Sequence, residues 1–140
     1  MANVSASKKL KKFVDISLAF TPNPVTGDLA VLKDERAINN SIKNIVLTIP
    51  GEVPFQRDMG STVTDYLFDL VDEGTAGLLM LEIRRAIAFN EPRAEDVEVF
   101  VEAQPHEHQF VVRIQYKIVG YDQVFVFDQI LRPTRYWYTP

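Results

Sequence analysis

The run EIRRAIAFNEPRAEDVEVFVEAQPHEHQFVVRIQYKIVG, residues 82–120, contains the change of hydrophobic period that decides the fold. Before Pro92 the apolar residues recur every three or four positions, which is typical of a helix with one buried stripe. After Pro92 they recur at every second position, which is typical of a strand with one buried face. Because proline disfavours helical geometry at the preceding residue, the sequence predicts that the helix ends at Glu91.

The segment after Pro92 predicts three strands. Valines recur at every second position from residue 97 to 101, flanked mostly by acidic residues, and a longer alternation of apolar and polar residues runs from 110 to 118. The polar residues 104–109 predict the turn between these two strands. A third strand is expected after Gly120. Because it is apolar at each of the positions 124–127, we expect it to be apolar on both faces.

Upstream of the quoted run, a first helix is predicted after Asp34. Four isoleucines follow at spacings of four, three and four, a pattern that predicts one buried helical stripe. They are Ile38, Ile42, Ile45 and Ile49. Pro50 and Gly51 come directly after the last of them, so we expect the helix to stop there.

Two more helices are predicted between residues 62 and 90. Thr62 with Asp65 three positions later favours a capping box, at the start of a short helix whose Leu70 would face the core. The longest helix starts at residues 72–75 and continues to about Asn90. Its predicted buried stripe consists of Leu79, Ile83, Ala86 and Ile87.

These patterns predict an α+β fold: a small antiparallel sheet with about three helices packed on one face. The segment before the first helix, residues 13–32, has short apolar stretches broken by turn dipeptides and favours short strands or extended chain. We divide the chain into a basic N-terminal arm at 1–12, a single domain at 13–131 and an aromatic C-terminal tail at 132–140.

Composition excludes several classes of protein. A length of 140 residues suits one domain, and the absence of cysteine excludes disulfides, thiol nucleophiles and thiolate metal sites. No apolar run approaches the roughly 18 residues of a membrane span, and residues 1–12 lack the apolar part of a secretory signal. We therefore expect no membrane partner, and a protein made in a cytoplasm.

The net charge of −4 hides a basic arm. Four lysines lie within residues 8–12, before the first acidic residue of the chain. Such an arm could touch nucleic acid, but it has no arginine or aromatic side chain for base stacking. A solvated or partner-bound arm is the better interpretation.

Candidate catalytic and metal-binding residues are few. Glu91 and Glu95 could form the carboxylate pair of a glycosidase, yet no apolar pattern suggests the pocket that would raise the pKa of an acid. His106 and His108 could bind a metal, but a third ligand is missing nearby, and a polar hairpin tip explains them. Phosphate-binding glycine loops and nucleophile elbows are absent. We expect no catalytic, cofactor or metal residues, and hence a binding or assembly protein.

The corner Asn90-Glu91-Pro92-Arg93 is the most distinctive local feature. Proline fixes the backbone there, so the flanking charges point in defined directions. Arg93 could dock on a partner at a small entropic cost, or Glu91 and Arg93 could pair with groups inside the domain. The residues themselves leave both alternatives open.

Four motifs in order give the chain a resemblance to a known family. They are Ser41-Ile42-Lys43-Asn44, Pro54-Phe55-Gln56-Arg57-Asp58-Met59-Gly60, Asp65-Tyr66-Leu67-Phe68 and Ala86-Ile87-Ala88-Phe89-Asn90-Glu91-Pro92-Arg93. The chain resembles the baseplate-wedge, sheath-initiator proteins of contractile phage tails, whose relatives serve in type VI secretion. The resemblance covers about residues 34–119, and the Glu-Pro-Arg corner is its most specific part.

The resemblance implies a structural subunit of the virion tail baseplate, assembled in the host cytoplasm, and not an enzyme. It implies docking of Glu91, Pro92 and Arg93 on the helical core bundle of other wedge proteins. Tail tube or hub proteins are further candidate partners. The family is often labelled lysozyme-like, so a muramidase using Glu91 or Glu95 is the alternative. A nucleic-acid-binding assembly factor that uses the basic arm is a second one.

The apolar third strand suggests how such a subunit would bind the sheath. An exposed apolar strand edge invites pairing with another chain, and only Asp122 and Asp128 flank this one. We expect a neighbour to complete the sheet by strand addition, and the resemblance implies the tail sheath subunit. The residues expected to take part are Val124, Phe125, Val126 and Phe127.

Overall fold

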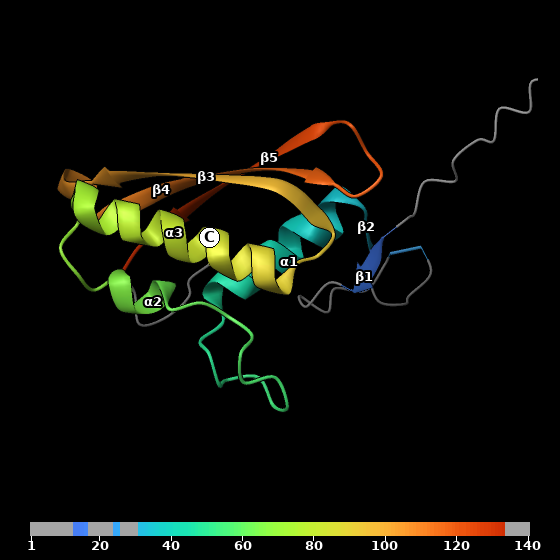
Figure 1. The fold of residues 1–140 in the computed structure, drawn as a ribbon, viewed down its shortest axis with the longest axis horizontal. Helices are drawn as coiled ribbons and strands as arrows, with labels where there is room; N and C mark the ends of the chain where they lie inside the picture. Colours follow the sequence, from blue (N-terminus) through green and yellow to red (C-terminus); the bar gives the residue numbers. More distant parts are fainter. Residues whose placement is uncertain (1–12, 17–23, 26–30, 134–140) are drawn as a thin grey trace, which may run out of the picture.

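Three antiparallel strands form the main sheet of the computed structural model, in the order β3-β4-β5 (Figure 1). They are β3 (Ala94–Gln104), β4 (Gln109–Ile118) and β5 (Val124–Leu131). The structure describes residues 13–16, 24–25 and 31–133, so the basic arm and residues 134–140 of the aromatic tail lie outside the described part. The three predicted strands are confirmed.

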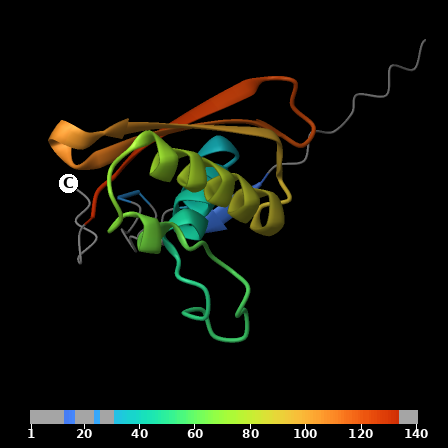
Figure 2. The same ribbon diagram turned by 60° about the vertical axis from the view of Figure 1, so that its left-hand side comes forward.

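Helices cover one face of this sheet. These are α1 (Glu35–Leu47), α2 (Val63–Tyr66) and α3 (Glu73–Asn90), and both views show α1 and α3 on the same side of the strands (Figures 1 and 2). The core lies between the two layers, where Ile42 and Ile83 pack with Ile114. The α+β class is therefore confirmed.

The termini of α3 follow from its sequence. Asp72 caps the helix, because its carboxylate accepts a hydrogen bond of 2.8 Å from the backbone N–H of Thr75. At the other end Asn90 is the last helical residue and Glu91 is the C-cap, as Pro92 predicts. β3 then begins at Ala94, two residues earlier than the alternation of valines suggests.

A second, two-stranded sheet lies at the N-terminal end of the domain. It pairs β1 (Val14–Ile16) with β2 (Val31–Lys33) in antiparallel register. Reciprocal bonds join Phe13 to Asp34 at its base: the Phe13 N–H donates to the Asp34 carboxylate at 3.0 Å, and the Asp34 N–H donates to the Phe13 carbonyl at 2.8 Å. The short strands expected in this segment are confirmed.

The prediction that Ile49 belongs to the buried stripe of the first helix is wrong. α1 ends at Leu47, and Ile49 is 49% exposed. Thr48 already has extended geometry, and its hydroxyl donates to the Asn44 carbonyl at 2.6 Å, which closes the last turn. The chain leaves the helix at that point and enters the loop that leads to α2.

Two predictions about the short helix are also wrong. Thr62 makes no side-chain cap; its backbone N–H donates instead to Glu82 on α3 at 3.0 Å. Leu70 is 76% exposed, because α2 ends at Tyr66 and the helical spacing that would turn Leu70 inward is not maintained. The contact from α3 replaces the local cap that the sequence suggested.

Candidate docking surfaces

The corner between α3 and β3 is fixed by backbone hydrogen bonds. The Glu91 N–H donates to the Ile87 carbonyl at 2.8 Å, and the Ala94 N–H donates to the Glu91 carbonyl at 3.2 Å. The Arg93 carbonyl accepts a hydrogen bond from Val119 at 3.0 Å. Pro92 lies exposed between them. The corner is thus a defined turn with an outward-facing proline.

The charges of the corner pair inside the chain. Arg93 binds Glu91 with two guanidinium hydrogen bonds, Nε to Oε1 at 2.6 Å and Nη2 to Oε2 at 2.8 Å. Its Nη1 donates to Asp15 on β1 at 3.0 Å, and the guanidinium lies 5.7 Å from the centre of the Phe13 ring. Glu91 is 2% exposed. Of the two alternatives left open, internal pairing is what the structure contains; docking at the corner stays a prediction.

This pairing determines the ionisation of Glu91. Burial alone would raise the pKa of Glu91, but hydrogen bonds from Arg93 and Ser41, with the charge of Arg93, outweigh burial and lower the pKa below its usual value. The hydrogen bond to Glu91 in turn raises the pKa of Arg93. Glu91 is therefore a carboxylate at neutral pH, whereas a glycosidase needs a protonated acid with a raised pKa.

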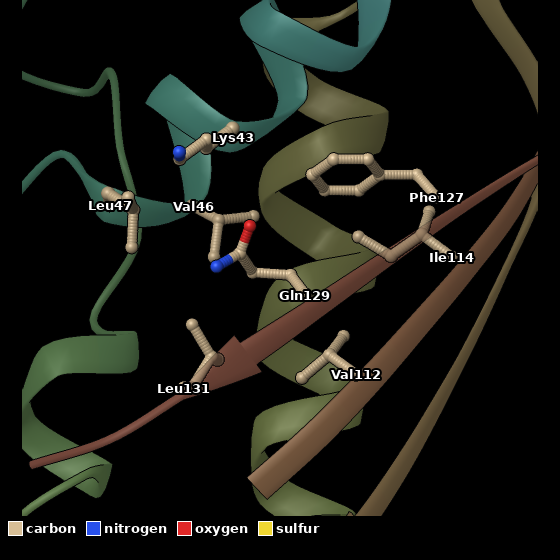
Figure 3. A pocket seen from close by; sticks show the side chains of 8 residues that line it. All are labelled: Lys43, Val46, Leu47, Val112, Ile114, Phe127, Gln129 and Leu131. Carbon is tan, nitrogen blue, oxygen red and sulfur yellow. The ribbon is translucent and has the colours of Figure 1, made fainter. Parts of the chain in front are cut away.

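No described hollow brings the suggested catalytic residues together. Figure 3 shows a small pit between α1 and β5, lined by Val46, Phe127, Leu131 and other largely apolar side chains, with room of about 10 Å³. Two wider hollows lie on the sheet, of about 700 and 420 Å³. Neither Glu91 nor Glu95 lines any of the three.

The metal interpretation gains no support from the structure. His106 and His108 are exposed at the hairpin tip, where residues 105–107 form the 3-10 turn η1. Within the described residues, no three His, Asp or Glu side chains are placed to hold a metal ion. In the same part of the chain, no helix has the length and apolar character needed to cross a membrane.

β5 is an edge strand with apolar side chains on the outside. Among the described residues its only sheet partner is β4, so its second edge has no strand beside it. Val124 is 50% exposed and Val126 is 49% exposed, and so is Ile130 further along the strand. The expectation of a strand that is apolar on both faces is therefore confirmed.

The inward face of β5 joins the core. Phe125 and Phe127 are half-buried against it, and the Phe125 ring stacks on Tyr116 with 5.9 Å between ring centres. Asp128 pairs with Arg113 across the sheet at 2.9 Å. The four residues expected for strand addition thus alternate between the core and the open face.

Three residues at the corner were missed by sequence reasoning: Phe13, Asp15 and Ser41. Asp15 lies 78 positions from Arg93 in the chain, and no local pattern marks it as an ion-pair partner. One weak signal in the sequence is that Asp15 is the first acidic residue after the basic arm, but this position does not identify Arg93 as its partner.

Comparisons with known proteins give one consistent result. The family model described as baseplate wedge protein gp25 matches residues 32–122. Baseplate wedge protein gp25 of Enterobacteria phage T4 is 29% identical over 84 residues, which is 60% of this chain and 64% of that protein. The match thus spans just under two thirds of the length of this relative.

Solved structures share the fold. A proposed tail lysozyme from Geobacter sulfurreducens superposes with a TM-score of 0.66 at 25% identity, over 76% of this chain and 97% of that one. A chain of the type VI secretion system baseplate complex gives 0.59 at 18% identity, over 68% of this chain and 89% of that one. A chain of the anti-feeding prophage baseplate gives 0.59 at 15%, over 88% and 87%. The last two likenesses concern the fold alone.

Proposed function

Because this chain belongs to the family of baseplate wedge protein gp25, we propose that it is a structural subunit of a contractile-tail baseplate and works in the virion tail. Its partners are other baseplate-wedge proteins and the tail sheath subunit, with tube or hub proteins as further neighbours. The observation that carries the proposal is the family match over residues 32–122, which contains α1, α3, the corner and the hairpin of the sheet.

The corner is the proposed contact with the wedge. Pro92 is exposed, and Arg93, with its side chain 22% exposed, keeps further N–H groups beyond those that bind Glu91 and Asp15. Glu91 holds the guanidinium in one orientation, so little side-chain entropy is lost when a partner binds it. Glu91 positions Arg93 in this proposal, while Pro92 and Arg93 touch the partner.

β5 is the proposed site where the sheath begins. Its free edge offers backbone N–H and C=O groups, and its outward valines offer apolar area to an added strand. Val124, Phe125, Val126 and Phe127 would form the centre of the pairing, with the two phenylalanines held by the core.

The test places a lysine on the edge strand β5 to prevent the pairing of a further strand. Lysine on an exposed edge strand discourages pairing with another chain, and Val126 is half-exposed, so Val126→Lys leaves the core intact. Phe100→Lys is the matched control, because Phe100 is 52% exposed on β3, the opposite edge of the same sheet. We expect Val126→Lys baseplates to assemble without sheath, and Phe100→Lys baseplates to grow sheath normally. Electron microscopy of purified tails measures both; full sheath on Val126→Lys baseplates contradicts the proposal.

A peptidoglycan-cleaving activity is the second candidate, because one similar structure is described as a tail lysozyme. The lowered pKa of Glu91 opposes it, since the carboxylate is engaged by Arg93 and cannot serve as a general acid near neutral pH. We therefore expect the purified chain to release no soluble fragments from peptidoglycan. Turnover that disappears in Glu91→Gln, while this variant keeps the circular dichroism spectrum of the wild type, would establish the enzyme instead.

A further inference from the structure

The strand β1 reaches the corner from outside the part of the chain that the family model matches. β1 is Val14–Ile16, whereas the match begins at residue 32. Both views place β1 beside the C-terminal end of α3, where the corner begins (Figures 1 and 2). The contacts between Arg93 and this strand therefore come from a segment that the family match does not include.

The Arg93 guanidinium is restrained from three directions, and only one of the restraints is local in sequence. Glu91 accepts hydrogen bonds from Nε at 2.6 Å and from Nη2 at 2.8 Å. Asp15 accepts a hydrogen bond from the other terminal nitrogen, Nη1, at 3.0 Å. Cζ of Arg93 lies over the Phe13 ring, 5.7 Å from its centre, which is within the range of a cation–π interaction. Glu91 by itself restrains only the edge of the group formed by Nε and Nη2.

The chain around β1 is anchored firmly enough to hold these two contacts in place. Phe13 and Asp34 exchange two hydrogen bonds, of 3.0 and 2.8 Å, and Asp34 is the N-cap residue of α1. The Ile38 N–H donates to the Asp34 carbonyl at 3.1 Å, and Ile38 is fully buried. The position of Phe13, and of Asp15 two residues later, is thus tied through Asp34 to the core.

These restraints leave Arg93 able to bind a partner. Each terminal nitrogen of a guanidinium has two N–H groups, and each of those nitrogens in Arg93 binds one described carboxylate, so each has a second N–H to offer. The Arg93 side chain is 22% exposed. Because Phe13 lies against one face of the guanidinium, a partner has to approach from the other face or from the terminal nitrogens.

We propose that Asp15 and Phe13 are positioning residues for the corner. They hold Arg93 in the orientation in which it binds the baseplate wedge, so the segment with β1 is a functional part of the docking surface. Neither residue has to touch the partner. The inference rests on the proposed contact between the corner and the wedge, and adds the residues that prepare Arg93 for it.

The opposite role for Asp15 would be to block Arg93 by occupying the place of an acidic group of the partner. The contacts favour positioning, because Asp15 takes a single N–H of Nη1 and the guanidinium keeps others. The two roles predict opposite results when the carboxylate is removed. Positioning predicts weaker docking, and blocking predicts stronger docking.

The first experiment removes the carboxylate on β1. Full-length Asp15→Ala and wild type are co-expressed with the other tail proteins, and mass spectrometry compares their ratio in purified baseplates with their ratio in the lysate. An arginine that has lost a restraint must be ordered on binding, so we expect the incorporation of Asp15→Ala to fall about fivefold. Asp128→Ala is the matched control and should be incorporated like wild type, because Asp128 also pairs with an arginine, Arg113, at 2.9 Å and is 55% exposed.

Three further measurements separate positioning from a merely structural role. The melting temperature of isolated Asp15→Ala should stay close to that of wild type, because the Asp15 side chain is 38% exposed and Arg93 keeps Glu91. Rotation about the Cζ–Nη1 bond of Arg93, measured by NMR in the free chain, should become faster in Asp15→Ala and stay unchanged in Asp128→Ala. Asp15→Asn should regain about half of the lost incorporation or more, since its side-chain oxygen still accepts a hydrogen bond. Unfolding of isolated Asp15→Ala would show a structural role and overturn the inference.

Phe13 is tested by a conservative pair of variants. Phe13→Leu removes the aromatic face and should lower incorporation, whereas Phe13→Tyr keeps this face and should be incorporated like wild type. Equal incorporation of Phe13→Leu and wild type overturns the role of Phe13. For Asp15→Ala, incorporation equal to wild type overturns the role of Asp15, and incorporation above wild type would show that β1 blocks docking.

Pro92→Glu distinguishes failure of this inference from failure of the proposed contact. Pro92 is exposed on the proposed docking surface and makes none of the contacts that restrain the guanidinium. If Pro92→Glu is incorporated like wild type, the proposed contact of the corner with the wedge fails. If Pro92→Glu is excluded while Asp15→Ala and Phe13→Leu are incorporated like wild type, the contact stands and only the positioning role is overturned.

Discussion

At the corner of the domain charged side chains are buried, whereas on its outward surfaces apolar side chains are exposed. At the corner, the charged Glu91 is buried and its partner Arg93 is largely covered, with both satisfied within the chain. On α3 and β5, apolar residues such as Leu81 and Val126 are half-exposed or more, with no described residue covering them. Buried charge contributes to the free chain only while its pair is intact, whereas exposed apolar area contributes only when a partner arrives. The corner should therefore control folding of the free chain in addition to its proposed contact with the wedge, whereas the apolar surfaces should affect association alone.

The largest expected effect is the loss of the corner pair. Arg93→Ala leaves the Glu91 carboxylate buried without its cation, so we expect the free energy of unfolding to fall by about 3–5 kcal/mol. Urea denaturation of the isolated chain measures it. Arg113→Ala is the control, since both partners of the Arg113–Asp128 pair are more than half exposed, and we expect it to leave stability nearly unchanged. Equal losses of unfolding free energy in Arg93→Ala and Arg113→Ala would contradict the expected difference between a buried and an exposed ion pair.

The two sides of α3 give the next largest difference. Leu79 is fully buried, so Leu79→Ala should lower the free energy of unfolding by about 2–5 kcal/mol. Leu81 is 60% exposed, so Leu81→Ala should change it by no more than about 0.5 kcal/mol. The same denaturation measurement compares them. A large loss of stability in Leu81→Ala would mean that the outward side of α3 already contributes to the fold.

A gain of stability is expected at Gly77 on the same helix. Gly77→Ala removes a flexible residue from the interior of α3 without a clash, and should raise the free energy of unfolding by about 0.5–1 kcal/mol. The melting temperature from circular dichroism reports the change. No gain, or a loss, would indicate a constraint on Gly77 inside the chain.

The smallest effect concerns the Glu82–Arg85 pair, in which Arg85 is exposed and Glu82 is partly buried. The hydrogen bond from Arg85 is the main cause that lowers the pKa of Glu82 to about 2, and the Thr62 N–H adds to it. A carboxylate with a lowered pKa stabilises the fold at neutral pH, and this contribution is lost as pH falls from about 4.5 toward 2. Solvent screening limits it to under about 1 kcal/mol. Denaturation at pH 6 and at about pH 2.5 should show a smaller difference for Arg85→Gln than for wild type.

Hydrophobic periodicity predicted an element correctly wherever the residues of that element alone determine its structure. The alternation of residues 110–118 placed β4, the most buried strand, and Pro92 placed the end of α3. The hairpin tip with His106 and His108 followed from a polar run between two strands. In each case, local backbone preference and burial on one face favour the same structure.

Errors occurred where a distant contact replaced a local one. The capping pattern at Thr62 was overridden by Glu82, which lies 20 positions away and takes the N–H of Thr62. Ile49 and Leu70 continue an apolar spacing past the point where each helix stops, so the pattern alone placed them inside. Apolar spacing indicates a face only while the backbone stays regular.

By itself the sequence determined the α+β class, the order of the strands and the existence of a rigid Glu-Pro-Arg corner, because these depend on spacing and on backbone preference at single residues. Only the tertiary structure decided that Arg93 binds Asp15 and Phe13, that Glu91 is buried beneath it, and that Leu81 and Val126 are exposed. These contacts and exposures result from packing between segments as far as 78 residues apart. The local pattern of residues contains no information about contacts over such a separation.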